Sequence, residues 1–465
     1  MTVAALRGAL GDRFVLTGED MAPWCRDWTG GYRWAPLCVA RPGTAEEVSA
    51  VLRIAHQAGQ AVVPVGGNTG LSGGTCGDGA VMLSLDRMNR IREIRPEARV
   101  AVVEAGVILG ALHAAAEAEG LSFPMTFGAK GSCTMGGILA TNAGGSNVLR
   151  YGNTRDLVLG LEVVLADGRI VDLMGALHKD NTGLNLRTLM IGSEGILGVI
   201  TAAVVKLVAQ PKAYATALLG MRDLEASLDL LNRLQAVTGG QVEAFEYMPR
   251  RYVEAYARLH PDARLPFEEG HDVTILVELG ATAPRDVVPG PDGQPPIAGL
   301  LETALGEMLE AGDLADAVVA HSEAQRRDFW ALREAAAEVC TSRPVIICDV
   351  AVPLDRVALF LGQADRRLAE MDPEAVAMVV AHLGDGNVHY SVWTETTGAA
   401  RNAIMEAVEE EALALGGSFS AEHGIGLAKR PAMARFKDPV ALEVMRSVKA
   451  ALDPKGILNP GKVIP

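Results

Sequence analysis

The chain has little that would assign it to a secreted, membrane-spanning or nucleic-acid-binding class. Its six cysteines form no CxxC pair and no zinc-ribbon spacing, so we expect free, mostly buried thiols in a reducing compartment. No stretch reaches the roughly 18 consecutive apolar residues of a membrane span. The start, MTVAALRGALGDRFVL, lacks the basic and apolar regions of a secretion signal. We therefore expect a cytoplasmic protein without integral membrane contact.

Basic residues are also fewer than acidic residues. The 465 residues include 42 Lys and Arg against 57 Asp and Glu, which gives a net charge of -15. Nucleic acids and anionic membranes both require a basic surface, so neither is expected as the main partner. With 49% hydrophobic residues, the chain can fill the cores of two or three domains.

Glycine, by contrast, is abundant. Its 51 residues make up about 11% of the chain, against ~7% in ordinary proteins. They follow no repeat period, which argues against a solenoid, and clustered glycine indicates backbone that turns sharply or lies close to another group. The clusters lie at 66–79, 128–145, 192–198, 384–386, 416–417 and 424–426.

Secondary-structure patterns predict an α+β domain at 37–210. Short apolar strands alternate there with glycine turns and with two helices, at 44–59 and 107–120. Thr44, three residues before Glu47, is typical of a helix N-cap. Further along, the patterns predict a Pro- and Gly-rich loop at 282–296, helices at 298–312, 322–340, 355–371 and 400–415, and a strand at 345–352.

Three glycine loops indicate a cofactor. The loop 64-PVGGNTGLSGGT-75 follows an apolar strand, and its successive backbone N–H groups suit a diphosphate. It matches neither GxGxxG nor GxxxxGK[ST], so Rossmann and Walker sites are not indicated. Taken alone, this loop is equally well explained as a turn between strands. Residues 128–152 and 191–201 repeat the pattern. We therefore expect the domain to bind a large cofactor that lies extended over its backbone, and FAD fits this description.

A pair of histidines flanks a tight turn in 381-AHLGDGNVHYSV-392. Apolar and β-branched residues on both sides of the turn predict a hairpin, whose two ends face each other. His382 and His389 are therefore either two ligands of one metal or buried rings satisfied by their neighbours. Three of the nine histidines fall between 382 and 423, a concentration that favours the metal.

Eight blocks of the sequence together resemble the FAD-dependent D-2-hydroxyacid dehydrogenases of the vanillyl-alcohol oxidase superfamily, and within them the D-lactate and D-2-hydroxyglutarate dehydrogenases. The resemblance covers about 35–465 and rests on PVGGNTGLSGG, AKGSCTMGGILATNAGG, GLEVVLADGRIV, KDNTG, GSEGILG, HLGDGNVH, AEHGIG and LDPKGILNPGK. It implies an α+β fold with an FAD-binding domain at 1–211 (core 35–211), a ferredoxin-like substrate domain at 212–420, and a C-terminal segment at 421–465 that returns to the flavin domain.

The resemblance also implies which residues contact FAD. None of the glycine loops contains the histidine through which covalent relatives attach their flavin, so we expect non-covalent FAD. The residues carried over are Pro64, Val65, Gly66, Gly67, Asn68, Thr69, Gly70, Leu71, Ser72, Gly128, Gly131, Ser132, Gly136, Gly137, Thr141, Asn142, Gly144, Gly145, Glu194, Gly195, Ile200 and Asn459.

By the same resemblance, His382, His389 and Glu422 bind a divalent metal, with zinc as first choice and iron or manganese as alternatives. Two imidazoles and one carboxylate leave coordination positions open for a substrate. His423 is then the catalytic base and also contacts the substrate. Neighbouring residues on a strand face opposite ways, so Glu422 and His423 can serve one site only if AEHGIG is a loop.

Two further residues are expected to bind the substrate. Arg333, in 329-FWALREAAAEV-339, matches the residue that holds the substrate carboxylate; the alternative is a surface arginine paired with Glu334 or Glu338. Asn387, in the turn, is expected to hold the substrate or a metal ligand. D-2-hydroxyglutarate dehydrogenases look to carry a hydroxyl residue and a lysine where this chain has Ala337 and Ile347. These departures favour a short or apolar side chain on the substrate, because a second buried carboxylate would lack its cation.

The expected function is oxidation of a D-2-hydroxy acid to the 2-oxo acid by an FAD-linked enzyme. The alternatives are a D-2-hydroxyglutarate dehydrogenase, a glycolate or 2-hydroxyacid oxidase subunit, a metallohydrolase and a flavin subunit that only relays electrons. The expected electron acceptor is an electron-transfer flavoprotein or a quinone, and a homodimer is the default assembly.

Overall fold

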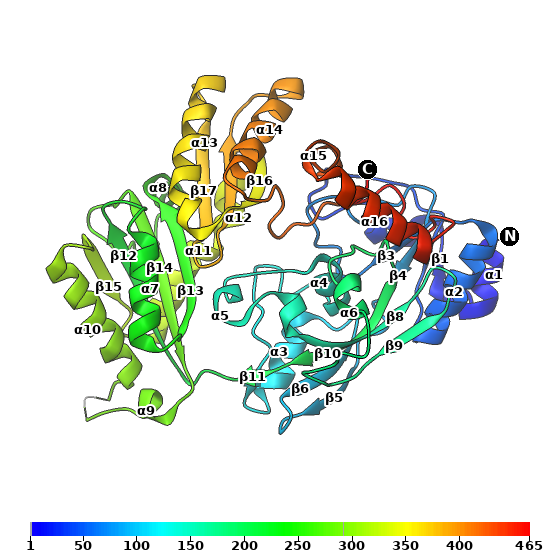
Figure 1. Ribbon diagram of the computed structural model, residues 1–465, viewed down its shortest axis with the longest axis horizontal. Helices are drawn as coiled ribbons and strands as arrows, with labels where there is room; N and C mark the ends of the chain where they lie inside the picture. The colour runs from blue at the N-terminus through cyan, green and yellow to red at the C-terminus, as the bar shows by residue number, and fades with distance from the viewer. Residues whose placement is uncertain (1, 292) are drawn as a thin grey trace. The chain divides into compact units, whose positions relative to one another are not determined.

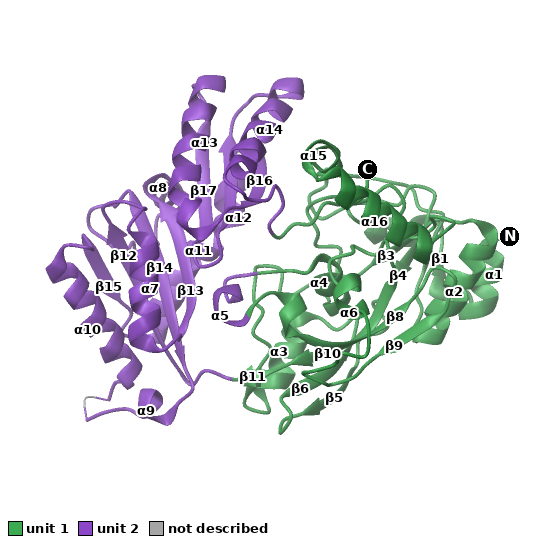
Figure 2. Cartoon of the chain, viewed as in Figure 1, with its two compact units in different colours: residues 1–144, 152–209, 422–465 green, residues 145–151, 210–421 purple. Residues whose placement is uncertain are grey.

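The computed structural model describes residues 2–291 and 293–465. The chain forms two compact units, each built from separate stretches of sequence (Figure 2). Unit 1 consists of residues 1–144, 152–209 and 422–465, and unit 2 of residues 145–151 and 210–421. The C-terminal segment therefore folds with the N-terminal part of the chain.

Unit 1 contains a small sheet with the strand order β1-β2-β4-β3. Strands β2, β4 and β3 run parallel, and β1 pairs with β2 in the antiparallel direction. The C-terminal tail extends this sheet, because Leu458 pairs with Val62 of β3. The strands are β1 (Val15–Leu16), β2 (Cys38–Ala40), β3 (Val62–Val65) and β4 (Val81–Ser84).

A second sheet of unit 1 is antiparallel, with the strand order β5-β6-β10-β8-β9. Its strands are β5 (Ile91–Arg95), β6 (Val100–Glu104), β8 (Val158–Val164), β9 (Ile170–Leu173) and β10 (Val199–Lys206), and a separate short pair is formed by β7 (Leu121–Ser122) and β11 (Val208–Ala209). The helices of unit 1 are α1 (Thr2–Leu10), α2 (Ala45–Ala58), α3 (Leu109–Glu117), α4 (Met135–Thr141), α6 (Leu186–Met190), α15 (Arg430–Phe436) and α16 (Pro439–Leu452).

Unit 2 is built on one antiparallel sheet of seven strands, in the order β15-β12-β14-β13-β17-β18-β16 (Figure 1). Long apolar strands form its centre because both faces are covered by helices. The strands are β12 (Ala213–Met221), β13 (Val242–Pro249), β14 (Val273–Ala281), β15 (Asp316–Val319), β16 (Val345–Ala351), β17 (Val376–His382) and β18 (Asn387–Trp393).

The two faces of this sheet carry different helices. One apolar cluster joins a face of the sheet to α7, α10, α13 and α14, and a second joins the other face to α8, α11 and α12. The helices of unit 2 are α5 (Val148–Tyr151), α7 (Ser227–Thr238), α8 (Arg250–Leu259), α9 (Pro284–Val287), α10 (Pro296–Ala311), α11 (Glu323–Glu334), α12 (Ala336–Thr341), α13 (Val357–Met371) and α14 (Gly398–Ala414).

Most predicted elements are present, with two differences. The single helix expected at 322–340 is wrong, because α11 ends at Glu334 and α12 begins at Ala336. The loop at 282–296 contains the short helix α9, which begins at Pro284, a residue suited to a first helical turn. Within the described residues, no helix is long and apolar enough to cross a membrane, and none of the described cysteines forms a disulfide.

Candidate active site

The first glycine loop packs directly on the second. A Cβ atom at Gly67 would overlap the carbonyl oxygen of Ser132, and one at Gly66 would overlap Oγ1 of Thr134. At Gly136, a Cβ atom would lie 2.8 Å from Cβ of Ala105. Side chains at these positions would push the loops apart, so glycine is required for the close approach of two backbones.

Strained backbone concentrates in the residues expected to contact FAD. Among the described residues other than glycine, six have a positive φ, and four of them belong to that set. Asn68 has φ 53°, Asn142 52°, Glu194 51° and Asn459 40°. Asparagine tolerates this left-handed region, but it is costly for glutamate. Such conformations persist where the surrounding structure over-determines them, and they cluster at ligand sites.

The C-terminal segment of unit 1 closes over the first glycine loop. Backbone N–H groups of Leu427 and Ala428 donate to the carbonyl of Ser72, at 2.8 and 3.1 Å. The Ser72 hydroxyl donates in turn to the carbonyl of His423, at 2.9 Å. A Cβ atom at Gly426 would overlap the Ser72 carbonyl. The backbone of His423 is thereby held against the loop, although it follows that loop by about 350 residues.

Glu194 joins this assembly as a buried acceptor. Its carboxylate accepts from the backbone N–H groups of Ile425 and Gly426, both at 2.8 Å. Burial raises the pKa of Glu194, while the two donors and the charge of Lys429 act in the opposite direction. The side chain therefore links the third glycine loop to the C-terminal segment.

The tail and α4 each leave one polar atom unsatisfied. Nδ2 of Asn459 donates to the carbonyls of Gly74 and Glu194, at 3.0 and 2.8 Å. Its Oδ1 is buried without a partner in the described chain, as is Oγ1 of Thr134. Buried polar atoms are normally paired, and unpaired ones often mark a missing ligand. These atoms, the glycine contacts and the left-handed residues fit an extended cofactor lying on unit 1.

A short segment leaves unit 1 beside Gly144 and packs on unit 2. Arg150 donates to Oε1 of Glu243 and to the carbonyl of Gly280, at 2.8 and 2.6 Å. The hydroxyl of Tyr151 donates to the same carboxylate oxygen at 2.6 Å. We call this segment, residues 145–151, the strap. It begins at Gly145, a predicted flavin contact, so Glu243 fixes backbone that continues directly into that region.

The histidines of unit 2 share one face of its sheet with three acidic or amide side chains. Glu246 on β13 is directly opposite His382 on β17, and His382 is opposite Asn387 on β18. His389 lies two residues beyond Asn387 and opposite Asp349 on β16. Directly opposite residues, and residues two apart on a strand, project from the same face. The predicted hairpin is confirmed. The centroids of the two imidazole rings are 5.4 Å apart, and the ring planes form an angle of 79°.

His382 is oriented by a buried carboxylate. Its Nδ1 donates to Oε1 of Glu246 at 2.8 Å, and Arg333 donates through Nε to Oε2 at 2.8 Å. Burial by itself would raise the pKa of Glu246, but the charges of His382 and Arg333 hold it at about 2. The carboxylate therefore stays ionised, and it turns Nε2 of His382 away from itself.

His389 faces a second carboxylate in the same manner. Its Nδ1 lies 3.5 Å from Oδ1 of Asp349, which also accepts from Nδ2 of Asn387 at 2.9 Å. Nδ2 donates to the carbonyl of Val350 as well, at 3.1 Å, while Oδ1 of Asn387 is buried without a partner among the described residues. Carboxylates behind metal-binding imidazoles orient the ring and raise its basicity. The potential ligand atoms of His382 and His389 lie within 4.8 Å of each other.

A third acidic group adds to the negative charge on this face. Burial raises the pKa of Asp385, and the neighbouring charges of Glu246 and Asp349 act in the same direction, whereas His382 opposes them. A buried carboxyl group whose pKa is raised by neighbouring carboxylates marks a place where a cation would be stabilised. The donor set of two imidazoles among carboxylates suits a divalent transition metal.

Arg333 is not the surface residue of the alternative explanation. It is 7% exposed and its partner is Glu246, so pairing with Glu334 or Glu338 is wrong. No described residue accepts from its Nη1. Ile347 is opposite Ser391 and two residues from Asp349, so it lies on the face of the histidines, and it is 41% exposed.

Glu422 and His423 begin the last segment of unit 1, directly after the end of unit 2. Ala421, the final residue of unit 2, donates from its N–H to the carbonyl of Asp349 at 3.3 Å. Glu422 is the next residue of the chain. The segment AEHGIG lies outside any helix or strand, as the two roles require.

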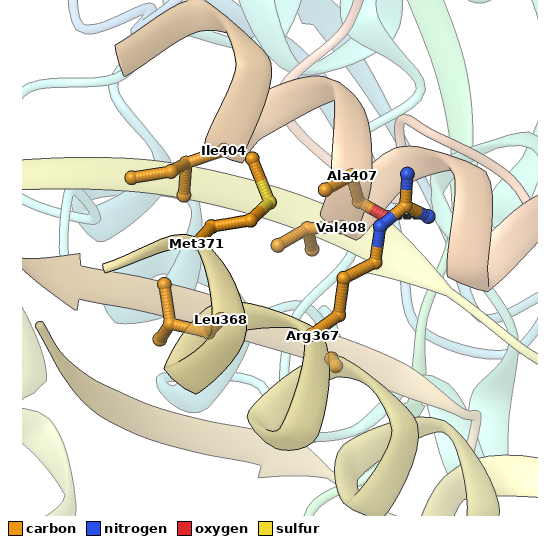
Figure 3. Close-up of a pocket in the computed structure, with 7 residues that line it drawn as sticks. Arg367, Leu368, Met371, Ile404, Ala407 and Val408 are labelled. Carbon is orange, nitrogen blue, oxygen red and sulfur yellow. Dashed lines mark hydrogen bonds between the residues drawn. The ribbon is translucent and has the colours of Figure 1, made fainter. Parts of the chain in front are cut away.

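Two hollows lie elsewhere in the units. One, too narrow to admit a water molecule, lies between α13 and α14 and is lined by apolar side chains such as Leu368, Met371 and Ile404 (Figure 3). The one charged residue in it, Arg367, pairs with Glu410 and Glu411, so this hollow is a packing seam. The other, of about 420 Å³, lies in unit 1 between α16 and the tail and is lined by Lys449, Asp453, Asn459 and Lys462 among others.

Comparison with known proteins assigns the chain. Residues 36–174 match the FAD binding domain family and residues 210–463 match the family of FAD linked oxidases, C-terminal domain. A D-2-hydroxyglutarate dehydrogenase from Bos taurus mitochondria is 37% identical, covering 100% of this chain and 83% of its own. The D-2-hydroxyglutarate dehydrogenase of Xanthomonas citri pv. viticola is also 37% identical, covering 96% and 92%. The chain belongs to the FAD-dependent D-2-hydroxyacid dehydrogenases. The predicted resemblance is confirmed, and the protein is an oxidoreductase that acts on a CH–OH donor.

Solved structures place the dehydrogenase in the expected fold. p-Cresol methylhydroxylase superposes with a TM-score of 0.74 at 17% identity, covering 99% of this chain and 96% of its own. An alkyldihydroxyacetonephosphate synthase superposes with a TM-score of 0.72 at 18% identity, covering 99% and 86%. The expected α+β fold is thereby confirmed, and these two proteins share it.

The sequence prediction missed the acidic residues that orient the site. Glu246 lies in 242-VEAFEYMP-249, a strand in which every residue is buried, and an acidic side chain in such a strand requires a partner. Asp349, in 345-VIICDVA-351, carries the same signal. Both could have been found as acidic residues in otherwise apolar strands, but their partners could not.

Proposed function

We propose that the dehydrogenase oxidises a D-2-hydroxy acid with a short or apolar side chain, at a divalent metal bound by His382, His389 and Glu422. The observation that supports the metal most is the pairing of Nδ1 of both histidines with a buried carboxylate. A metal would then be bound through Nε2, with Glu246 and Asp349 as the groups behind the ligands.

The remaining residues take distinct parts. Bound FAD supplies a hydride acceptor, and a divalent metal supplies a Lewis acid that lowers the pKa of an alcohol. His423 accepts the proton of the substrate hydroxyl as general base. Arg333 binds the substrate carboxylate through its Nη1 edge, while Glu246 fixes the guanidinium plane. Asn387 holds Asp349 in place for His389.

The substrate side chain is the point on which the residues and the relatives differ. Ile347, exposed on the face of the histidines, offers an apolar contact and no charge. The curated relatives, however, are named D-2-hydroxyglutarate dehydrogenases, which makes D-2-hydroxyglutarate the second candidate. In that case a cation other than residue 347 would have to meet the distal carboxylate.

One anaerobic experiment separates these candidates. Purified enzyme with assayed FAD and metal is mixed with D-lactate, a longer apolar D-2-hydroxy acid and D-2-hydroxyglutarate, and the flavin absorbance is followed. Bleaching by the monocarboxylates alone is expected. Bleaching by D-2-hydroxyglutarate would contradict the part given to Ile347 and leave the reaction class unchanged. The Ile347→Lys variant is expected to shift preference toward D-2-hydroxyglutarate.

His423 is tested separately from FAD binding. His423→Ala is expected to lose flavin reduction by about 100- to 10,000-fold, with the FAD content unchanged. Flavin reduction at the normal rate would remove His423 from the mechanism. Treatment of the wild type with a chelator is expected to stop reduction by substrate while dithionite still reduces the flavin.

For the setting of the enzyme, we propose non-covalent FAD, a cytoplasmic location, and a homodimer. The proposed electron acceptor is an electron-transfer flavoprotein or a quinone. An oxidase would instead pass electrons to oxygen, and peroxide released during aerobic turnover distinguishes the two.

A further inference from the structure

Two cations of unit 1, Lys462 and Arg430, have no acidic partner among the described residues, and Lys462 is buried. Lys462 is 7% exposed, and its Nζ donates only to the carbonyl of Pro460, two residues back, at 3.2 Å. Nε of Arg430 is buried and has no acceptor. Neither side chain forms an ion pair with a carboxylate of residues 2–291 or 293–465. A buried charge without a counter-charge is strongly unfavourable.

The positive charge of Arg430 acts on the ammonium group of Lys462. Burial lowers the pKa of Lys462, and the charge of Arg430 lowers it further, with only the Cys76 thiol acting in the opposite direction. Cys76 cannot serve as the counter-charge, because burial raises the pKa of its thiol and keeps it protonated. Buried Lys462 therefore lies beside a second positive charge, and no described carboxylate pairs with it.

The position of the pair is fixed on the glycine loop. Val463, next to Lys462, donates from its N–H to the carbonyl of Gly426 at 3.1 Å, and Gly426 packs on Ser72. Arg430 begins α15, and its N–H donates to the carbonyl of Leu427, whose own N–H donates to Ser72. Both cations thus lie in segments whose backbone is connected by hydrogen bonds and packing contacts to Ser72, in the first glycine loop.

There is also room for a ligand beside Lys462. With Asn459, it lines the hollow of about 420 Å³ in unit 1, in which Asp453 is the acidic side chain. Asp453 is already occupied, because Nζ of Lys449 and the N–H groups of Ile457 and Leu458 donate to its carboxylate. It is therefore no counter-charge for Lys462.

We propose that Lys462 and Arg430 are the positive complement of a negatively charged part of FAD. The inference rests on the binding of FAD by unit 1, and it assigns to the cofactor two residues that contribute charge where the glycine loops contribute only backbone N–H groups. The negative group is either the diphosphate or the N1–C2=O edge of the flavin, which gains negative charge on reduction. Either group would offset the positive charge of Lys462 and Arg430, and its hydrogen bonds to them would be charge-assisted.

The test compares Lys462→Met and Lys462→Arg with Lys437→Met. Lys437 is an exposed lysine of the same C-terminal segment that does not line the hollow, so its variant controls for loss of one charge. Apoprotein is titrated with FAD and, separately, with riboflavin, which lacks the diphosphate. Thermal unfolding of each apoprotein and the flavin midpoint potential of each holoenzyme are also measured.

Lys462→Met is expected to weaken FAD binding by about 10- to 100-fold and to raise the melting temperature of the apoprotein. The two effects have opposite signs because the ammonium that Lys462→Met removes is an unpaired charge in the apoprotein but a binding group for FAD in the holoenzyme. Lys462→Arg is expected to retain FAD affinity, and Lys437→Met to leave both quantities unchanged. If riboflavin affinity is unaffected, the diphosphate is the partner; if the midpoint potential falls instead, the partner is the flavin edge.

Two results would overturn the proposal. One is unchanged FAD affinity and unchanged potential in Lys462→Met, and the other is a loss of apoprotein stability that accounts for any loss of FAD. If Lys462→Met does not fold, Arg430→Gln is measured in the same way. Wild-type apoprotein that fails to bind FAD would contradict the cofactor assignment itself, which is a different outcome from wild-type binding that the variants do not change.

Discussion

The two units use opposite means to build the enzyme. In unit 1 the proposed cofactor surface consists of backbone: glycines that allow two loops to touch and four residues with positive φ. In unit 2 the proposed metal site consists of side chains on one face of a regular sheet, each held by another side chain. FAD is long and needs many N–H groups, whereas a metal needs a few atoms in fixed directions. The size of the proposed ligand thus explains why one surface is built from backbone groups and the other from side chains.

This difference determines which substitutions are tolerated. A backbone surface fails when a Cβ atom is added, even a small one, and is little affected by changes of charge. A side-chain site fails when a polar group is replaced by one of equal size but different charge. The predictions below test this distinction with pairs of variants that differ in only one of these respects.

The largest effect is expected for Gly67→Ala. Its Cβ atom would overlap the Ser132 carbonyl, so the first two glycine loops must separate. We expect a loss of about 3 kcal/mol or more in unfolding free energy and no measurable FAD binding. Gly70→Ala is the control, because its Cβ atom meets no described atom within 4 Å.

Gly70→Ala is expected to leave the stability of the apoprotein within about 1 kcal/mol of wild type. Its FAD affinity should nevertheless fall, because Gly70 lies in the loop over which the cofactor is proposed to lie. Chemical denaturation of the apoprotein and fluorescence titration with FAD separate the two effects. Equal stability of Gly67→Ala and wild type would contradict the close contact between the loops.

The second comparison concerns two buried glutamates beneath α11. Glu246 accepts from Arg333 and His382, and Glu278 accepts from Arg326, Trp330 and Thr216. Glu246→Gln leaves buried Arg333 without its counter-charge, so this variant should lose about 3–5 kcal/mol. Glu278→Gln leaves Arg326, which is only partly buried, with Glu323 as a remaining partner, so it should lose less, about 1–3 kcal/mol. Only Glu246→Gln should also lower metal affinity, by about 10- to 100-fold.

Metal content after dialysis against graded chelator measures this difference. An equal loss of metal from Glu278→Gln would mean that metal affinity follows general stability, and the orienting role of Glu246 would be withdrawn. Full retention of metal in Glu246→Gln, with the stability loss as expected, would mean that the His382 ring is held by packing alone.

The same contrast explains what the sequence could predict. The backbone site was visible because close contact and left-handed φ select for glycine and asparagine, which form local motifs in the first and second loops. His382 and His389 were visible because a hairpin turn lies between them. Glu246 was not, because it precedes its partner His382 by 136 residues, and no local pattern links the two strands.

Arg333 shows the limit of local patterns most directly. Near Glu334 and Glu338 in sequence, it has the features of an exposed helical arginine, yet α11 turns it toward Glu246. The break at Ala335 was also not predicted, because Ala and Glu around it favour helix and the interruption depends on how α12 packs. Where the role of a residue depends on a contact with a distant strand, that role can be recognised only from the fold.

A moderate effect is expected at the strap. Glu243→Gln removes the charge partner of Arg150 and weakens the bond from Tyr151, at a cost of about 1–3 kcal/mol. FAD affinity should fall a few-fold, since the strap continues into Gly144. Asp313→Asn, which breaks an exposed pair with Arg233, is the control and should cost under about 1 kcal/mol.

The pH dependence of Glu243→Gln has a definite sign. Burial raises the pKa of Glu243, against the effects of Tyr151 and Arg150. Above about pH 4.3, the folded wild type therefore binds more protons than the unfolded chain, and its unfolding free energy falls as pH rises through that window. The variant should lack this fall. A steeper fall in the variant would show that the carboxyl is ionised more readily than burial implies.

The smallest effect is expected at Thr44, and it tests whether the backbone site depends on ordinary side-chain contacts. Oγ1 of Thr44 accepts from the N–H of Glu47 at 3.2 Å and caps α2. Thr44→Ala should cost about 1 kcal/mol, and Thr44→Ser much less. Helix α2 packs on the small sheet that leads into the first glycine loop, yet it contributes no residue to the proposed site. FAD affinity should therefore be the same for both variants and wild type wherever the proteins are folded. A loss of affinity in Thr44→Ala alone would show that small movements of the sheet reach the loop, and that the backbone surface is less rigid than its glycine contacts indicate.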